Sequence, residues 1–235
     1  MEKYQINCPD SLCELAELTS DLLNEKIDEY KLFFQIDEIG VVKCNYFDDL
    51  TEFREFIYEL RGERESLPEY ARGTYDGEMI NAYIEPKNQK NRLYTASHEL
   101  FHILYLKYIL HNDYSKRIVW YDEGMAQFMS GEKRKLSDEQ RFKLYYNKVR
   151  KNTLLLPNMN ELEHGNSFCN NQYDGYDLCY LAIKYLSEIL DNNEFRNLMF
   201  DFDKIKKIGI NILNDMFDYY DNKYLKVENR KNNNV

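Results

Sequence analysis

The sequence is poor in the residues and segments that mark disulfide-stabilised, secreted or membrane-spanning proteins. Its 235 residues include only five cysteines, which are odd in number, widely spread and without a Cys-x-x-Cys pair. This pattern excludes a disulfide framework and a cysteine metal cluster, and it favours free thiols in a reducing compartment. The first residues form no apolar leader and no apolar run is long enough to cross a bilayer, so we expect a cytoplasmic protein with no membrane partner.

Positive charge is scarce relative to negative charge. The chain has 31 lysines and arginines against 41 aspartates and glutamates, which gives a formal net charge of -10 at pH 7. Such a chain is not attracted to phosphates, which argues against nucleic acid as a main partner. Hydrophobic residues make up 43% of the sequence, enough for one sizeable core in a chain of this length. The composition leaves the substrate and the oligomeric state open.

Strand patterns occur only in about the first 90 residues, and helical patterns dominate afterwards. Residues 40–47 and 79–85 predict strands, and residues 73–78 predict a turn that leads into the second strand. Apolar spacing predicts helices over residues 11–33, 50–60, 88–112, 120–129, 137–150, 173–190, 194–200 and 208–220.

This order of elements predicts an α+β fold made of two lobes that form one catalytic unit. A small mixed-sheet lobe, residues 1–112, ends in the helix with the only closely spaced histidines. A helical lobe follows over residues 113–225. We expect residues 226–235, which are polar and rich in asparagine, to form a flexible tail.

Histidine is rare, with four residues in the chain, yet two of them fall in the pattern His-Glu-x-x-His as His98, Glu99 and His102. On an α-helix the two rings project within ~40° of each other and about one turn apart, so both can reach one point beside the helix. Glu99 points to the side of the pair, where its carboxylate can contact a water held at that point. This arrangement is typical of a zinc site with a general base beside it.

A purely structural role for the same residues is the alternative. The two histidines would then be core residues bonded to the backbone, or part of a solvated helix face. Apolar residues surround them on all sides of the helix, which predicts burial on most faces. Burying two unpaired imidazoles there would cost several kcal/mol, so the pattern favours a metal site.

A second motif supplies a candidate for a third ligand. The segment from Trp120 to Ala126 has the form Trp-x-x-Glu-Gly-x-Ala, and its Glu123 follows His102 by 21 positions. With this motif and His-Glu-x-x-His, the chain resembles the gluzincin metallopeptidases, including the smaller peptidase MA-like domains. The resemblance implies a zincin-like fold, an active-site helix at the junction of the two lobes, and Glu123 as the third ligand of one zinc ion.

Two alternatives accompany this assignment. Glu123 could be an ordinary solvated carboxylate on a helix, and Asp122 could replace it as the ligand. The sequence also departs from the thermolysin-like members at Gln127, one turn after Glu123, where those proteins have an acidic residue. Another group must therefore orient the metal ligands.

A third resemblance lies in the helical segment that begins at Tyr176. It is similar to the run in which a tyrosine of the family points its hydroxyl at the reacting carbonyl, and it implies Tyr176 as the oxyanion donor. Tyr173 lies one turn earlier on the same side and is the alternative donor. His164, in the preceding loop, is a further candidate for this role, and a packing aromatic is the structural alternative.

The strand before the His-bearing helix lines the cleft in the smaller domains of this family. The resemblance therefore implies that the backbone of Asn81, Ala82 and Tyr83 binds the substrate. If this strand lies at the edge of the sheet, its free N–H and C=O groups can pair with an extended peptide. An ordinary internal strand is the alternative.

Taken together, the motifs predict a zinc metallopeptidase that acts on a peptide or protein substrate. The zinc ligands are His98, His102 and Glu123, and Glu99 is the general base. The aminopeptidase motif Gly-x-Met-Glu-Asn is absent, which favours an endopeptidase. The alternative function is a metal-stabilised binding or regulatory protein of the same fold, with weak or absent hydrolysis.

Overall fold

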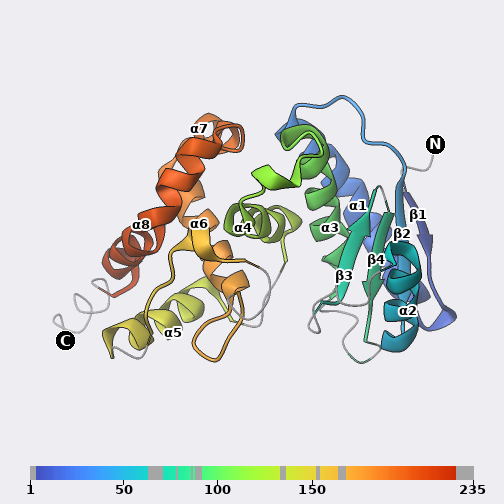
Figure 1. Cartoon of the computed structure of the whole chain (residues 1–235), viewed down its shortest axis with the longest axis horizontal. Coiled ribbons are helices and arrows are strands. Elements are labelled where there is room, and N and C mark those ends of the chain that lie inside the picture. The colour runs from blue at the N-terminus through green and yellow to red at the C-terminus, as the bar shows by residue number, and fades with distance from the viewer. Residues whose placement is uncertain are drawn as a thin grey trace, which may run out of the picture. The chain divides into compact units, whose positions relative to one another are not determined.

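The computed structural model describes residues 4–62, 71–77, 79–85, 87, 92–132, 136–151, 154–163 and 168–225. These residues form four strands and eight α-helices, together with short 3₁₀ and π-helical turns (Figure 1). The chain divides into two compact units. The first contains Met1–Tyr114 and Met129–Lys133, and the second contains Ser115–Phe128 and Arg134–Val235. The predicted mixture of a small mixed sheet with many helices is confirmed.

The first unit is built on a mixed sheet with the strand order β1-β2-β4-β3. Its strands are β1 (Tyr4–Asn7), β2 (Val42–Phe47), β3 (Gly73–Asp76) and β4 (Met79–Tyr83). β1, β2 and β4 run parallel, whereas β3 runs antiparallel to β4. Asn81 of β4 lies opposite Asn45 of β2 on one side and Thr74 of β3 on the other. Within the described residues, β3 is therefore the outer strand next to β4.

Helix α2 (Leu50–Arg61) covers one face of this sheet (Figure 1). The ring of Phe47 in β2 packs against Phe53 of α2, with centroids 5.7 Å apart. The helix begins at Asp49, whose side chain accepts a hydrogen bond from the Glu52 N–H at 2.9 Å. This N-cap confirms the helix start that the sequence predicts there.

Helices α1 (Cys13–Phe34) and α3 (Thr95–Leu104) pack on the opposite face, and they are joined through Tyr30. The Tyr30 hydroxyl donates to the backbone carbonyl of Ser97 at 3.0 Å, and its ring packs edge-on against Phe101. Eight of the ten residues of α3 are buried. The predicted burial of the His-bearing helix is thus confirmed, and the helix continues as a π-helical turn over Tyr105–Ile109.

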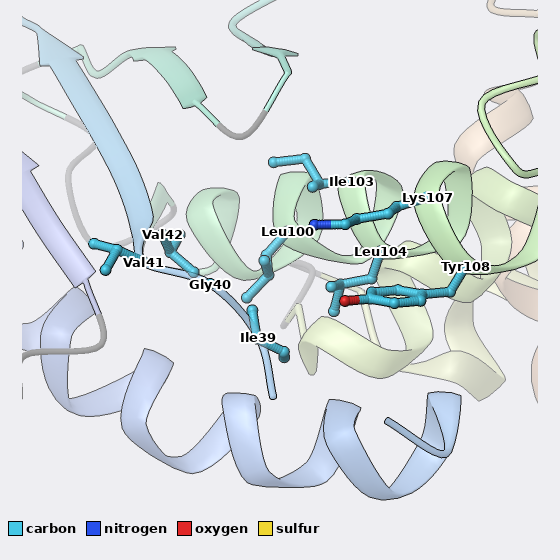
Figure 2. A pocket seen from close by; sticks show the side chains of 9 residues that line it. All are labelled: Ile39, Gly40, Val41, Val42, Leu100, Ile103, Leu104, Lys107 and Tyr108. Atoms are coloured by element: carbon cyan, nitrogen blue, oxygen red, sulfur yellow. The ribbon is translucent and has the colours of Figure 1, made fainter. Parts of the chain in front are cut away.

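The segment that leads into β2 rests on another side of α3 and forms a small apolar pocket with it (Figure 2). The lining residues are Ile39, Gly40, Val41, Val42, Leu100, Ile103, Leu104, Lys107 and Tyr108. The Tyr108 hydroxyl donates to the backbone carbonyl of Glu38 at 3.5 Å. These contacts hold the His-bearing helix against the start of a central strand.

The second unit is helical. Its helices are α4 (Val119–Ser130), α5 (Asp138–Arg150), α6 (Gly175–Ile189), α7 (Asn192–Leu198) and α8 (Phe202–Tyr220). Of α4, the residues up to Phe128 belong to this unit. Gly124 of α4 lies so close to α6 that an added Cβ would be 2.6 Å from the Cys179 carbonyl oxygen. Trp120 is fully buried, and its indole N–H donates to the Asn160 side chain at 3.2 Å. The Trp and the Gly of the second motif thus have packing roles that fix α4.

One prediction about the sheet is wrong, and one pair of alternatives is decided. Residues 73–76 form the strand β3 instead of a turn, and the chain reverses at Gly77, whose φ is 56°. The strand that carries Asn81, Ala82 and Tyr83 is the internal strand of the two alternatives left open above, because β2 and β3 pair with it on both sides. The backbone N–H and C=O groups of β4 are therefore already paired with β2 and β3. β1 has no predicted counterpart, since four half-exposed residues give too short a pattern.

His164 and residues 226–235, the predicted tail, lie outside the described residues. In the part of the chain that is described, no helix combines the length and the apolar character needed to cross a membrane.

Candidate metal centre

His98 and His102 lie on successive turns of α3 with their rings facing each other. The two Nε2 atoms are 3.1 Å apart, and the ring planes meet at 78°. His102 is 4% exposed, and the side chain of His98 is 14% exposed. The two Nε2 atoms can therefore bind one ion at a point that is shielded but not sealed from solvent.

Glu132 lies on the far side of the His98 ring. Its Oε2 is 3.9 Å from Nδ1 of His98, whereas Nε2 of the same ring faces His102. A carboxylate beside one ring nitrogen favours the tautomer in which the other nitrogen is the metal ligand. The sequence gives no signal for this contact, because Glu132 belongs to neither motif.

The carboxylate of Glu99 packs against β3. An added Cβ at Gly73 would lie only 2.6 Å from Oε1 of Glu99, so the absence of a side chain permits this approach. Tyr75, two residues further along the same face of β3, stacks on the His102 ring at a centroid distance of 5.9 Å. Neither contact could be predicted from the sequence, which indicates a turn at these positions.

Glu123 supplies the third candidate ligand from α4. His98, His102 and Glu123 each offer one ligand atom, and these atoms all lie within 4.8 Å of one another. Glu123 is 4% exposed. Among the described residues, Asp122 is not a member of this group, and its carboxylate instead accepts a hydrogen bond from Arg117.

The donor set fits zinc. Two imidazole nitrogens and one carboxylate oxygen are the ligands of many hydrolytic zinc sites, where the fourth position is left for water. All five cysteines are free, as the sequence predicts. Burial raises the pKa of Cys44 to about 12 and that of Cys169 to about 11. These two thiols stay protonated near neutral pH, which makes them poor competitors for a metal.

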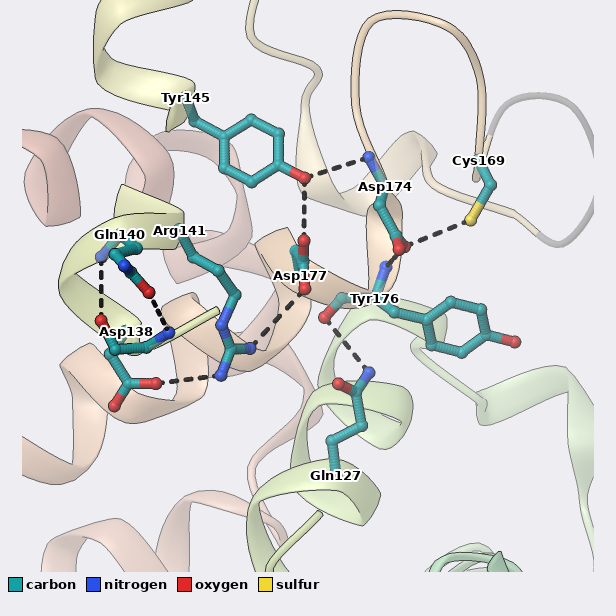
Figure 3. A network of polar contacts seen from close by, with 10 residues as sticks. Gln127, Asp138, Gln140, Arg141, Tyr145, Cys169, Asp174, Tyr176 and Asp177 are labelled. Carbon is teal, nitrogen blue, oxygen red and sulfur yellow. Dashed lines mark hydrogen bonds and ion pairs between the residues drawn. The ribbon is translucent and has the colours of Figure 1, made fainter. Parts of the chain in front are cut away.

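The backbone around Tyr176, in the first turn of α6, is fixed by a polar network (Figure 3). Asp174 caps the helix by accepting a hydrogen bond from the Tyr176 N–H at 2.9 Å. The side chain of Gln127 donates to the Tyr176 carbonyl at 3.1 Å. Tyr145 donates to Asp177 at 3.1 Å and accepts from the Asp174 N–H at 3.3 Å. Gln127 thus joins α4 to the start of α6.

The two candidate tyrosines occupy different local structures. The ring of Tyr176 packs edge-on against Phe168 at 4.8 Å, and its hydroxyl points away from the polar network (Figure 3). Tyr173 lies in the turn before α6, where its N–H donates to the Asn170 side chain at 3.2 Å. The oxyanion role of Tyr176, or of Tyr173 in its place, stays a prediction.

Comparison with known proteins identifies the family. Residues 72–225, more than half of the chain, match the family model described as Collagenase, Peptidase_M9. The matched range includes β3, α3, α4 and α6, and with them both motifs and both tyrosines. Comparisons with curated proteins and with solved structures found no match. The chain therefore belongs to the collagenase family Peptidase_M9, a family of metallopeptidases.

Proposed function

We propose that the protein is a zinc-dependent endopeptidase of the gluzincin type. The observation that carries this proposal is the approach of ligand atoms from His98, His102 and Glu123 to within 4.8 Å of one another. Glu99 follows His98 directly on the same helix, so a general base stands beside the group. The family match supports peptides or proteins as the substrates.

Each residue of the site has its own role in the proposed hydrolysis. His98, His102 and Glu123 hold the metal. Bound zinc supplies a Lewis acid that lowers the pKa of water and polarises the scissile carbonyl. Glu99 accepts the proton of the attacking water and passes it to the leaving amine. Tyr176 donates a hydrogen bond to the oxygen on which negative charge develops.

The substrate backbone is aligned by β3 in this proposal. β4 is paired on both sides, so the role predicted for Asn81, Ala82 and Tyr83 passes to the next strand of the sheet. β3 is the last strand of the described sheet, and its face toward α3 carries Gly73 next to Glu99. The Tyr75 carbonyl at this edge accepts a hydrogen bond from Arg61 at 2.7 Å, so a peptide would pair with the Gly73 end of β3. Such a peptide is held along its interior and needs no free terminus. This mode of binding supports endopeptidase activity.

Gly73→Ala is expected to lower kcat by about 10–100-fold, because a displacement of the base by about 1 Å can have an effect of that order. The added methyl group would lie 2.6 Å from Oε1 of Glu99 and must displace this carboxylate. Zinc affinity should stay at the wild-type value. The matched control is Gly77→Asn in the same hairpin, where nothing lies within 4 Å of an added Cβ and the residue tolerates a positive φ. Wild-type kcat in Gly73→Ala would refute the proposed position of Glu99.

The proposed function is tested with peptides that are blocked at both ends. The purified protein is expected to cleave them at internal bonds, to lose this activity in a zinc chelator, and to regain it with one equivalent of zinc. Cleavage that continues in the chelator would exclude a metallopeptidase. A protein that binds zinc and cleaves no member of a broad peptide library would instead be the metal-stabilised binding protein.

A further inference from the structure

Arg117 makes contact with both acidic residues of the second motif. Its Nε donates to Oδ2 of Asp122 at 2.5 Å, and its Nη2 donates to Oε1 of Glu123 at 2.8 Å. The Asp122 side chain is 2% exposed and that of Glu123 is 5% exposed, whereas that of Arg117 is 16% exposed. The Arg117 guanidinium group, just before α4, therefore bridges the buried carboxylates of Asp122 and Glu123, which lie in the first turns of that helix.

The guanidinium group suits this position for a geometric reason. It is planar and always charged, and it presents its N–H groups in a fixed fork, so two donors can hold two carboxylates at defined angles. A lysine ammonium would act as a point charge and would not fix either carboxylate in orientation.

The charges in this cluster also suit a cation site. Arg117 offsets one of the two negative charges, so the cluster keeps a net negative charge for a divalent ion. Carboxylates that bind metals are themselves held by hydrogen bonds, and loss of such a partner weakens metal binding. Gln127, one turn after Glu123 on α4, donates to the Tyr176 carbonyl at 3.1 Å.

We propose that Arg117, held in place by Asp122, is a positioning residue that fixes the orientation of the Glu123 carboxylate, which would hold zinc. This inference rests on the proposed zinc site. Arg117 acts on zinc binding through Glu123. Asp122 acts one step further out, through Arg117.

The experiment measures the zinc Kd by competition with a chromophoric chelator at fixed pH, on full-length variants whose fold is checked by circular dichroism. Arg117→Met is expected to raise the zinc Kd by about 10–100-fold. Arg117→Lys, which keeps the charge without the fork, should show a smaller rise. The control is Arg150→Met on α5, whose exposed side chain pairs with Asp221, and it should leave the Kd unchanged.

A second comparison separates positioning from mere stabilisation. Asp122→Asn should raise the zinc Kd in the wild-type background and should have no further effect when Arg117 is already Met, because its influence passes through that residue. If Arg117→Met does not fold, the zinc Kd values of Arg117→Lys and Asp122→Asn test the same inference.

An unchanged zinc Kd in folded Arg117→Met or Arg117→Lys would overturn the inference and leave the zinc site intact. A lower Kd would also overturn it, since Arg117 would then compete with zinc for Glu123. A wild-type protein that binds no zinc would overturn the proposed function itself, so the two failures are distinguishable.

Discussion

Glu99→Gln is expected to lower peptide hydrolysis by about 10²–10⁴-fold while zinc binding stays unchanged. The amide has nearly the shape of the carboxylate but cannot accept the proton of the attacking water. Glu99 is 9% exposed and lies against Gly73, so a residue of equal size preserves the packing. Rate constants with a blocked peptide and zinc content of the same preparations give the two quantities needed.

The control for this substitution is Glu139→Gln on α5, whose carboxylate pairs with Lys143 near the surface. It should cleave at the wild-type rate. If Glu99→Gln binds zinc normally and also cleaves at the wild-type rate, Glu99 is not the general base. If Glu99→Gln loses zinc, its carboxylate helps to hold the metal and the assignment of the three ligands is wrong.

Tyr176→Phe is expected to lower kcat by about 10²–10³-fold, which corresponds to ~2.7–4 kcal/mol of transition-state stabilisation. The substitution removes one hydroxyl and keeps the ring that packs against Phe168. The backbone of this residue is fixed at its N–H by Asp174 and at its carbonyl by Gln127, so the hydroxyl is presented from a rigid turn. Because the hydrogen bond forms only as charge develops, KM and zinc affinity should change little.

Tyr173→Phe provides the comparison, since it removes a hydroxyl from the alternative donor three residues earlier. We expect it to cleave at about the wild-type rate. The opposite outcome, a large loss in Tyr173→Phe with none in Tyr176→Phe, would transfer the oxyanion role to Tyr173. No loss in either variant would mean that neither phenol stabilises the transition state.

The parts of the fold that sequence predicts well are those with a local cause. The apolar stripe of α1, the start of α2 at residue 50 and the buried character of α3 follow from the local residue pattern of one element. The pairing of His98 with His102 is of the same kind, because four residues on one helix fix the distance between the rings. Glu123 required the resemblance to a family, since no local rule relates α3 to α4.

The features that sequence did not predict depend on contacts between distant segments. β3 has only four residues and is a strand because β4 pairs with it. The same pairing makes β4 an internal strand. Gly73 matters because Glu99, 26 positions away, lies against it. The contacts of Arg117 with Asp122 and Glu123 are close in sequence, yet their spacing of five and six residues matches no regular helical pair.

X-ray absorption spectroscopy at the zinc edge, on protein that has been purified and loaded with one equivalent of zinc, tests the metal centre most directly. We expect one tightly bound ion per chain, with scattering from two imidazoles, oxygen ligands and no sulfur. Replacement of Glu123 by Ala should remove one oxygen ligand and weaken the binding. Sulfur in the first coordination sphere, a single imidazole, or a spectrum that Glu123→Ala leaves unchanged would contradict the proposed site.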